Sequence, residues 1–179
     1  WQKGGQVLAG AILGTSMGAL FGIVYALSRN MLPGKSDLKK TFSLAAMMWV
    51  AIYFIPFLKY PANPPTVGDT ETVVLRAILY LGFIAISGFG AVGFYQLYKR
   101  LKSKSKIIAF AGYAVFIGIV FAVMPPNPDE VTAPMDLVNG FRAVSVVAVS
   151  VFWVSLAAIL GLFWGKFRPD AKQSVTQTR

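Results

Sequence analysis

The 179-residue sequence contains no cysteine and no histidine. The absence of cysteine excludes disulfide bonds, thiolate metal sites and cysteine nucleophiles from this chain. The absence of histidine removes the commonest transition-metal ligand, the usual axial ligand of haem and the usual general base. No arrangement of nucleophile and base is visible among the other residues. The sequence therefore does not predict an enzyme, and no cofactor is evident.

Charged residues are scarce as well. They make up 13% of the chain, whereas 56% of the residues are hydrophobic and the mean hydropathy is +0.62. A soluble domain carries about twice that charged fraction. The apolar residues form long blocks without an amphipathic period, which is typical of an integral membrane protein.

Five of these blocks are long enough to cross a hydrocarbon core about 30 Å thick. We therefore expect an all-α, polytopic transmembrane helix bundle over residues 1–165, followed by a polar cytoplasmic tail at residues 166–179. The five expected membrane-spanning helices are residues 5–28, 41–58, 71–98, 107–124 and 137–164.

The basic residues predict the orientation of this bundle. The formal net charge is +10, but the charges lie between the apolar blocks, which argues against a nucleic-acid partner. The loops at residues 29–40 and 99–106 and the tail hold most of the Lys and Arg residues. The positive-inside rule then predicts a cytoplasmic C-terminus and two Pro-rich loops on the non-cytoplasmic side. We expect the plasma membrane or another energy-transducing membrane.

The first Pro-rich loop joins the second and third expected helices. Its prolines lack backbone donors and hold φ near −65°, so the segment is extended or turned. Gly68 permits a positive φ, and Pro56, within the preceding helix, predicts a kink. We expect this loop to form a rigid outer cap. The residues of this structural motif are Pro56, Lys59, Tyr60, Pro61, Asn63, Pro64, Pro65, Gly68, Asp69 and Arg76, with Arg142 after the second Pro-rich loop.

Acidic residues in the two Pro-rich loops are candidates for a cation entrance, because carboxylate oxygens suit hard divalent ions. The competing interpretation is helix capping, which suits Asp69, Glu71 and Asp136, since a helix N-terminus favours negative charge. Asp129 and Glu130 are less easily explained as caps and are the better entrance candidates. The residues do not identify the metal.

Three basic residues, Lys59, Arg76 and Arg142, lie near the same boundary. They either extend to lipid headgroups or pair with loop acids and lock the loops over the bundle. The expected acidic partners are Asp69, Glu71 and Asp136. No acidic residue lies inside an apolar block, although ion pumps and proton-coupled carriers usually keep an ionisable group at membrane depth.

The first expected helix carries glycines four residues apart, which places them on one face. Such a stripe lets another helix approach closely and predicts a packing face, a glycine zipper. A groove lined by bare backbone is the alternative. The glycines of this stripe are Gly10, Gly14, Gly18 and Gly22.

The two Pro-rich hairpins resemble each other weakly. Asn63-Pro64 is followed by Arg76 in the first, and Asn127-Pro128 is followed by Arg142 in the second. A duplication would give a parallel repeat, as in some transporters. Independent selection of similar loop residues is the alternative.

The segment Pro56-Phe-Leu-Lys-Tyr-Pro-Ala-Asn-Pro-Pro65, followed by Val67-Gly-Asp69 and Arg76, closely resembles the CbtA family of membrane proteins, proposed subunits of a cobalt transporter. The resemblance extends over most of the chain, including a second acidic loop that ends in Phe141-Arg142. It implies cobalt as the transported ion and a companion subunit, a small CbtB-like partner with a His-rich segment. Because this chain has neither His nor Cys, either the soft or nitrogen ligands for cobalt would come from that partner, or this chain would supply only oxygen ligands and a path.

Two hypotheses about function follow. In the first, the chain is a membrane subunit of a cobalt (divalent cation) uptake system, with loops that collect the ion. In the second, it is a structural or accessory subunit that packs among lipids and other subunits of a larger membrane complex, without transport activity of its own.

Overall fold

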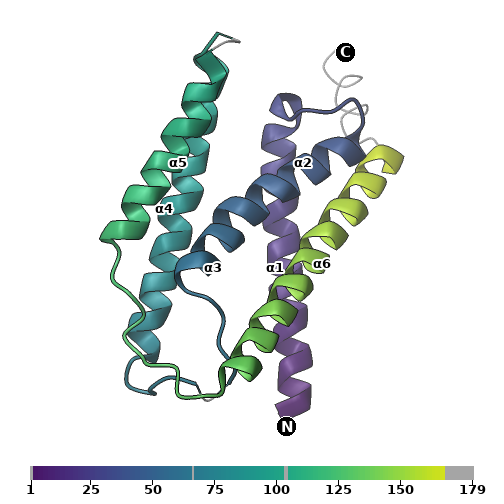
Figure 1. Cartoon of the computed structure of the whole chain (residues 1–179). Coiled ribbons are helices and arrows are strands. Elements are labelled where there is room, and N and C mark those ends of the chain that lie inside the picture. The colour runs from purple at the N-terminus through teal and green to yellow at the C-terminus, as the bar shows by residue number, and fades with distance from the viewer. Residues whose placement is uncertain (1, 66, 103–104, 168–179) are drawn as a thin grey trace, which may run out of the picture. The chain divides into compact units, whose positions relative to one another are not determined.

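The computed structural model describes residues 2–65, 67–102 and 105–167, and the regular structure of that part of the chain is entirely helical (Figure 1). Five helices are long and apolar enough to cross a membrane, and the shortest has 18 residues. They are Lys3–Met31, Asp37–Lys59, Val73–Arg100, Lys106–Val123 and Met135–Phe167. The expected all-α, polytopic fold with five spanning helices is confirmed. The orientation of the C-terminus stays a prediction.

The elements in chain order are α1 (Gln2–Ser28), the 3₁₀ turn η1 (Arg29–Met31), α2 (Asp37–Trp49), the π-helical turn η2 (Val50–Phe54), α3 (Ile55–Lys59), α4 (Val73–Arg100), α5 (Lys106–Val123) and α6 (Met135–Phe167). The second spanning segment starts at Asp37 rather than at residue 41. Ser36 explains the earlier start, because its Oγ accepts a hydrogen bond of 3.3 Å from the N–H of Lys39, as an N-cap does. At the other end, α6 includes the first two residues of the expected tail, and residues 168–179 lie outside the described residues.

The chain divides into two compact units. Unit 1 comprises residues 1–47 and 150–179, and unit 2 comprises residues 48–149. Unit 1 thus holds α1, most of α2 and the second half of α6. Unit 2 holds the π turn, α3, α4, α5, both Pro-rich loops and the first half of α6.

In unit 1, α2 packs closely on the second half of α6 at Gly161. A Cβ at this position would lie 2.5 Å from Thr41 Oγ1 and 2.8 Å from Leu38 Cα, so a larger residue would push the helices apart. The Thr41 hydroxyl, fully buried, donates to the carbonyl of Ala157 at 2.8 Å. Small residues and interhelical hydrogen bonds of this kind hold helices together in lipid.

The glycine stripe of α1 is largely unused within unit 1. A Cβ on Gly18 would meet Leu156 Cδ2 at 3.8 Å, whereas one on Gly10, Gly14 or Gly22 would meet nothing within 4 Å. The packing role of the stripe therefore stays a prediction. No helix among the described residues of unit 1 packs against its other three glycines.

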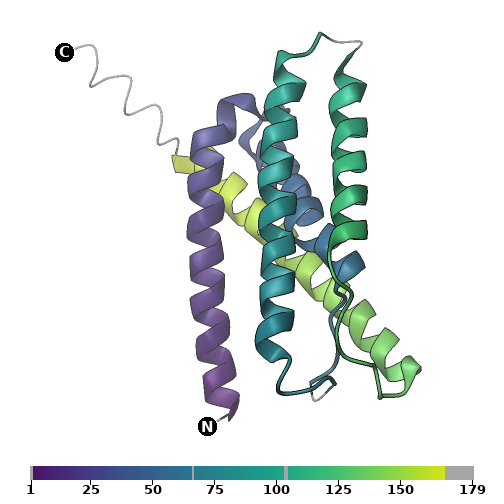
Figure 2. The ribbon, with the colours of Figure 1, turned by 90° about the vertical axis from the view of Figure 1, so that its left-hand side faces the viewer.

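In unit 2, α4 and α5 form an antiparallel hairpin that lies side by side in both views (Figures 1 and 2). Each helix presents a glycine to a phenylalanine of the other. A Cβ on Gly90 would lie 2.5 Å from Phe116, and one on Gly112 would lie 2.8 Å from Phe94. The two aromatic rings thus fill the space that the glycines leave, and this fixes the register of the hairpin.

A π-helical turn precedes Pro56. The N–H of Ile55 bonds to the carbonyl of Val50, five residues back. In this pattern the next donor would be the N–H of residue 56, aimed at the carbonyl of Ala51, but proline has no N–H. The buried Ser87 of α4 supplies the missing donor, with its Oγ 2.5 Å from the Ala51 oxygen.

Tyr113 of α5 completes this buried polar group. Its hydroxyl lies 3.0 Å from Ser87 Oγ and donates to the Ser87 carbonyl at 3.2 Å. Side chains of neighbouring helices thus satisfy the backbone group that a proline leaves unpaired in the membrane. The π turn, α4 and α5 are tied together at one point.

We predict that Ser87→Ala lowers the free energy of unfolding by about 1–2 kcal/mol, because it leaves the Ala51 carbonyl without a donor. The loss should shrink in a Pro56→Ala background, where residue 56 regains an N–H. Denaturant titration in detergent micelles for both single variants and the double variant measures this coupling. Ser155→Ala, at an exposed serine of α6, is the matched control. An equal loss in both backgrounds would contradict the proposed pairing.

Candidate functional site

The two Pro-rich loops meet at one end of unit 2, and the carboxylate of Asp129 joins them. It accepts hydrogen bonds from the N–H of Asp69 at 2.9 Å and from the hydroxyl of Thr72 at 2.7 and 2.8 Å. Arg76 Nε lies 3.0 Å from Asp129 Oδ2. The Nε–H does not point at that oxygen, so this contact is an ion pair without a hydrogen bond. The Asp129 side chain is only 7% exposed, and both of its oxygens are occupied.

Gly68 makes this contact sterically feasible. Its φ is 102°, a conformation that a residue with a side chain rarely adopts. A Cβ there would lie 2.5 Å from both Arg76 Nη1 and Asp129 Oδ2. The loop backbone therefore passes directly over the ion pair, and Arg76 also donates from Nη2 to the Asp69 carbonyl at 2.9 Å.

Arg142 makes the reciprocal connection. It follows the second loop in sequence but binds the first, with Nη2 2.9 Å from Asn63 Oδ1 and Nε 3.4 Å from the Ala62 carbonyl. Arg76, which follows the first loop, binds Asp129 of the second. Each arginine thus holds the loop of the other hairpin. We call this pair of cross-connections the loop clasp.

Two further residues of the motif fasten the first loop to the end of α5. Lys59 Nζ donates to the Phe121 carbonyl at 2.7 Å and lies 4.7 Å from the centre of the Phe121 ring. The Tyr60 hydroxyl donates to the Pro125 carbonyl at 2.6 Å. Burial raises the pKa of Tyr60, so this hydroxyl keeps its proton at neutral pH.

The charge partners differ from those that the sequence indicated. Arg76 pairs with Asp129 rather than with an acid of its own loop or with Asp136, while Lys59 and Arg142 bind carbonyl and amide oxygens. The expectation rested on nearness in sequence, whereas the folded loops exchange partners. The sequence left two interpretations open for these basic side chains, extension to lipid headgroups or binding within the chain. In the structure all three bind within the chain.

The other four entrance candidates are exposed. Asp69 Oδ1 accepts the N–H of Glu71 at 3.0 Å within the loop, and α4 begins after Thr72 without a side-chain cap. Asp136 lies in the first turn of α6, where the helix dipole favours a carboxylate. Glu71 and Glu130 are exposed in the loops. No group of three Asp or Glu residues in the described part of the chain is close enough to hold a metal ion.

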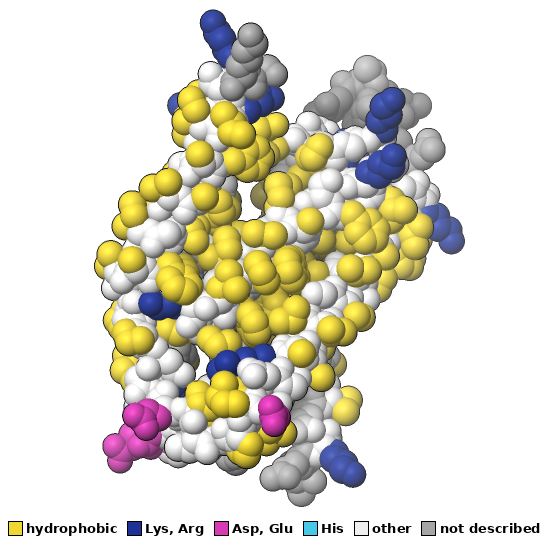
Figure 3. Space-filling model, viewed as in Figure 1, with side chains coloured by type: hydrophobic (Ala, Val, Ile, Leu, Met, Phe, Trp, Pro, Cys, Tyr) yellow, Lys and Arg dark blue, Asp and Glu magenta, His cyan; other side chains and the backbone are white. Residues whose placement is uncertain are grey.

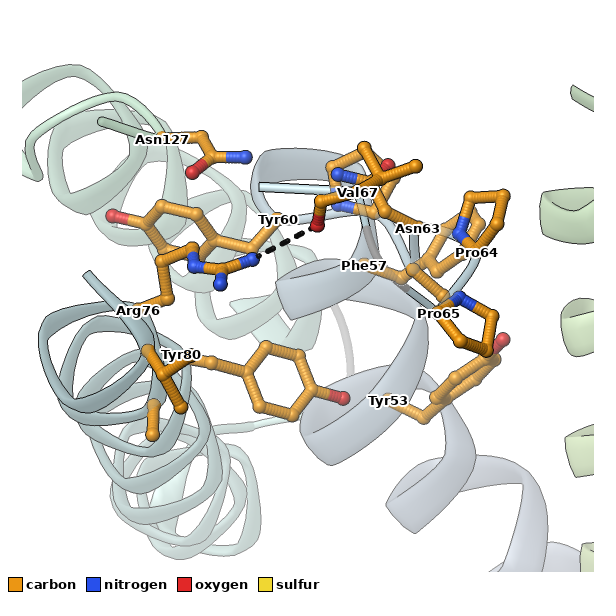
Figure 4. Close-up of a pocket in the computed structure, with 14 residues that line it drawn as sticks. Tyr53, Phe57, Tyr60, Asn63, Pro64, Pro65, Val67, Arg76, Tyr80 and Asn127 are labelled. Atoms are coloured by element: carbon orange, nitrogen blue, oxygen red, sulfur yellow. Dashed lines mark hydrogen bonds between the residues drawn. The ribbon is translucent and has the colours of Figure 1, made fainter. Parts of the chain in front are cut away.

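A cavity of about 570 Å³ lies beneath the first loop (Figure 4). Tyr53, Phe57 and Tyr80 form aromatic walls, the loop prolines cover them, and Arg76 and Asn127 contribute polar groups. Figure 4 shows Arg76 pointing to the Val67 carbonyl, a hydrogen bond of 3.4 Å. The sequence does not predict this cavity. The one feature of the sequence that indicates it is the spacing of Trp49, Tyr53 and Phe57, which lie four residues apart before the loop.

Unit 2 also has a distinct charge distribution. Figure 3 shows hydrophobic side chains along the α4–α5 hairpin, with acidic side chains at its loop end and basic ones at its opposite end. Glu71 and Glu130 belong to the loop end, and Lys99, Arg100 and Lys106 to the other. Charged ends on either side of an apolar hairpin are typical of a segment that spans a membrane.

The helices, the clasped loops and the apolar surface define a multi-pass integral membrane protein. A family model described as a probable cobalt transporter subunit (CbtA) matches residues 1–165. The chain belongs to the CbtA family, which is a family of transporter subunits and not of enzymes. Neither the curated proteins nor the solved structures gave a match.

We predict that Asp129→Ala lowers the free energy of unfolding by about 2–4 kcal/mol. It leaves the Arg76 guanidinium without its counter-charge and the N–H of Asp69 without an acceptor, while the Thr72 hydroxyl keeps only the Asp69 carbonyl. Glu130→Ala, at the exposed neighbouring acid, should change it by less than about 0.5 kcal/mol. Thermal unfolding in micelles and protease cleavage within the two loops measure the difference. Similar small effects of both substitutions would show that the clasp does not hold the loops.

Proposed function

We propose that this chain is a membrane subunit of a cobalt uptake system that acts with a small, His-bearing, CbtB-like partner. Membership of the CbtA family supports the cargo. A role for the partner in binding the metal is supported by the ligands that this chain lacks. The chain has no His or Cys, and its described part has no group of three carboxylates close together. Tight and selective binding of a transition metal usually relies on imidazole or thiolate ligands. In this proposal the partner supplies them.

The loop acids have a different part in this proposal. Asp129 holds the clasp, so it is not the entrance. Glu71 and Glu130, which are exposed, together with Asp69 and Asp136, attract divalent cations to the loop end of unit 2. The basic turn between α4 and α5 supports an orientation with the loops on the non-cytoplasmic side of the plasma or another energy-transducing membrane and the C-terminus in the cytoplasm.

The second candidate is an accessory subunit that packs within a larger membrane complex and moves no ion itself. One observation favours it: the acids within the spanning segments are Asp37 and Asp136, each in the first turn of its helix and none at membrane depth. The unused glycines of α1 would then be a contact face for another subunit. Under this candidate, loss of the chain would destabilise a complex without a specific effect on cobalt.

We predict that cells which express this chain together with the partner accumulate radioactive cobalt faster than cells that express either one alone. Glu71→Gln combined with Glu130→Gln should raise the KM for cobalt by about threefold or more at low ionic strength, and this difference should vanish in high salt. The maximal rate should stay unchanged, because the clasp is intact. Lys99→Gln, at the opposite end of the hairpin, is the control.

Two outcomes would favour the accessory subunit instead. One is cobalt uptake that does not depend on this chain. The other is normal growth under cobalt limitation after deletion of its gene, combined with co-purification of the chain in a large complex.

A further inference from the structure

The turn between α4 and α5 carries a positive charge that no nearby acid of unit 2 balances. No Asp or Glu occurs in the sequence between Glu71 and Asp129, and both of these acids belong to the Pro-rich loops, at the other end of the hairpin. Figure 3 shows basic side chains at this end of the hairpin and acidic ones at the loop end. The described basic residues of the turn, which we call the basic turn, are Lys99, Arg100, Lys102 and Lys106.

The ion pairs of the chain leave this charge uncompensated. The two pairs that join described residues are Arg29 with Asp37 in unit 1 and Arg76 with Asp129 in unit 2, and neither includes the basic turn. Unit 1 thus supplies an acid, 2.6 Å from the Arg29 Nε, beside a cation of its own, whereas unit 2 supplies none beside the basic turn. Counter-charge for the basic turn therefore comes from outside unit 2.

Two lysines of the basic turn are placed over tyrosine rings. Lys106 Nζ of α5 lies 4.6 Å from the centre of the Tyr98 ring, and Lys99 Nζ of α4 lies 5.8 Å from that of Tyr95. The two rings are stacked with their centres 6.2 Å apart, and Phe110 of α5 meets the Tyr98 ring edge-on. The stacked tyrosines thus hold ammonium groups from both helices beside one aromatic platform. An ammonium group has three N–H donors, and a cation–π contact leaves donors for an anion.

The aromatic platform also indicates the depth of the basic turn in a membrane. Tyrosine rings concentrate at the boundary between lipid headgroups and hydrocarbon. On the hydrocarbon side of the platform the hairpin exposes apolar side chains, among them Phe89 and Val92 of α4 and Val115 of α5. Lysine side chains that extend away from this boundary place their ammonium groups at the level of the lipid phosphates. The phosphodiester of a lipid is the anion that a membrane itself supplies at this level.

We propose that the basic turn binds the headgroup of an anionic phospholipid, with phosphodiester oxygens that accept hydrogen bonds from its ammonium groups and acyl chains that lie along the exposed apolar surface of the hairpin. Basic clusters next to a spanning helix attract anionic lipids. The tyrosine rings make this cluster a site, because ammonium groups that are already held in place lose less conformational freedom on binding. The site is at the opposite end of unit 2 from the loops and does not depend on the proposed cobalt function.

The test uses the full chain in neutral detergent micelles, with phosphatidylglycerol as the anionic probe and phosphatidylcholine of the same acyl chains as the zwitterionic probe. Native mass spectrometry measures the lipids bound per chain. Phosphatidylglycerol should bind at one copy per chain and at least about fivefold more tightly than phosphatidylcholine. Lys99→Gln combined with Lys106→Gln should remove this preference.

Lys35→Gln combined with Lys39→Gln is the matched control. It removes the same charge from exposed lysines at the loop between α1 and α2 and the start of α2, where Asp37 supplies an acid between them. This control should change the preference for phosphatidylglycerol by less than about twofold, because the basic turn is intact.

Tyr98→Leu tests the aromatic platform, because it keeps every charge and removes the ring beneath Lys106. It should weaken the binding of phosphatidylglycerol about two- to fivefold, as expected for a lost cation–π contact. Loss of a ring also affects the packing of the hairpin. The quantity compared among the variants is therefore the rise in melting temperature that the lipid causes, and this rise should be smaller in Tyr98→Leu.

Equal binding of the two lipids would overturn the proposal and would favour an acidic segment of another subunit as the counter-charge. So would an equal loss of binding in the Lys35 and Lys39 control, because net charge alone would then explain the preference. Undiminished binding by Tyr98→Leu would show that the platform does not form the site. Displacement of the lipid by millimolar inorganic phosphate would assign the basic turn to a soluble anion instead.

Discussion

A backbone carbonyl inside a membrane must find a donor within the protein, and Pro56 withholds one from Ala51. Much of unit 2 follows from this constraint. The helix adopts a π turn, Ser87 of α4 donates to the orphaned carbonyl, and Tyr113 of α5 joins the same group. The π turn also brings Tyr53 to the cavity under the first loop. One missing N–H thus links the packing of three helices to the shape of the cavity beneath the first loop.

The loop clasp likewise uses side chains where backbone donors are missing, here to hold the two Pro-rich loops together at the end of the helices. Pro-rich loops have few backbone donors with which to hold one another, so side chains make the connections: Arg76 and Thr72 to Asp129, and Arg142 to Asn63. The exchange is reciprocal, since each arginine follows one loop and binds the other. The weak sequence similarity of the two hairpins is only partly reflected in the clasp. The two arginines have corresponding roles, but Asn63 accepts from Arg142, whereas Arg76 pairs with Asp129 and not with Asn127.

The spanning helices could be predicted from the sequence because hydropathy and length act locally, and the same holds for Gly68, whose positive φ is set by its own loop. The start of α2 was missed although Ser36 is an ordinary N-cap signal. The partners of the basic residues could not be predicted, since Arg76 and Asp129 are far apart in sequence and meet only when the loops fold together. The cavity could not be predicted from the sequence either, because its lining residues come from separate segments. Its walls come from the π turn, both loops and α4, and the lone signal was a row of aromatic residues that equally well describes a membrane-interface belt.

The polar groups of unit 2 divide into those that the fold satisfies and those that it leaves available. Asp129 pairs with Arg76, and Arg142 and Lys59 bind amide and carbonyl oxygens, so these side chains hold the loops and helix ends. The exposed carboxylates of Glu71 and Glu130 are left available. Neither of these sets resembles a site for selective binding of a transition metal, which usually relies on imidazole or thiolate ligands, and this chain contains no His and no Cys. For a member of the probable cobalt transporter subunit family, we therefore propose that selectivity for the metal lies in another subunit, while this chain supplies the scaffold and the electrostatic attraction of the ion.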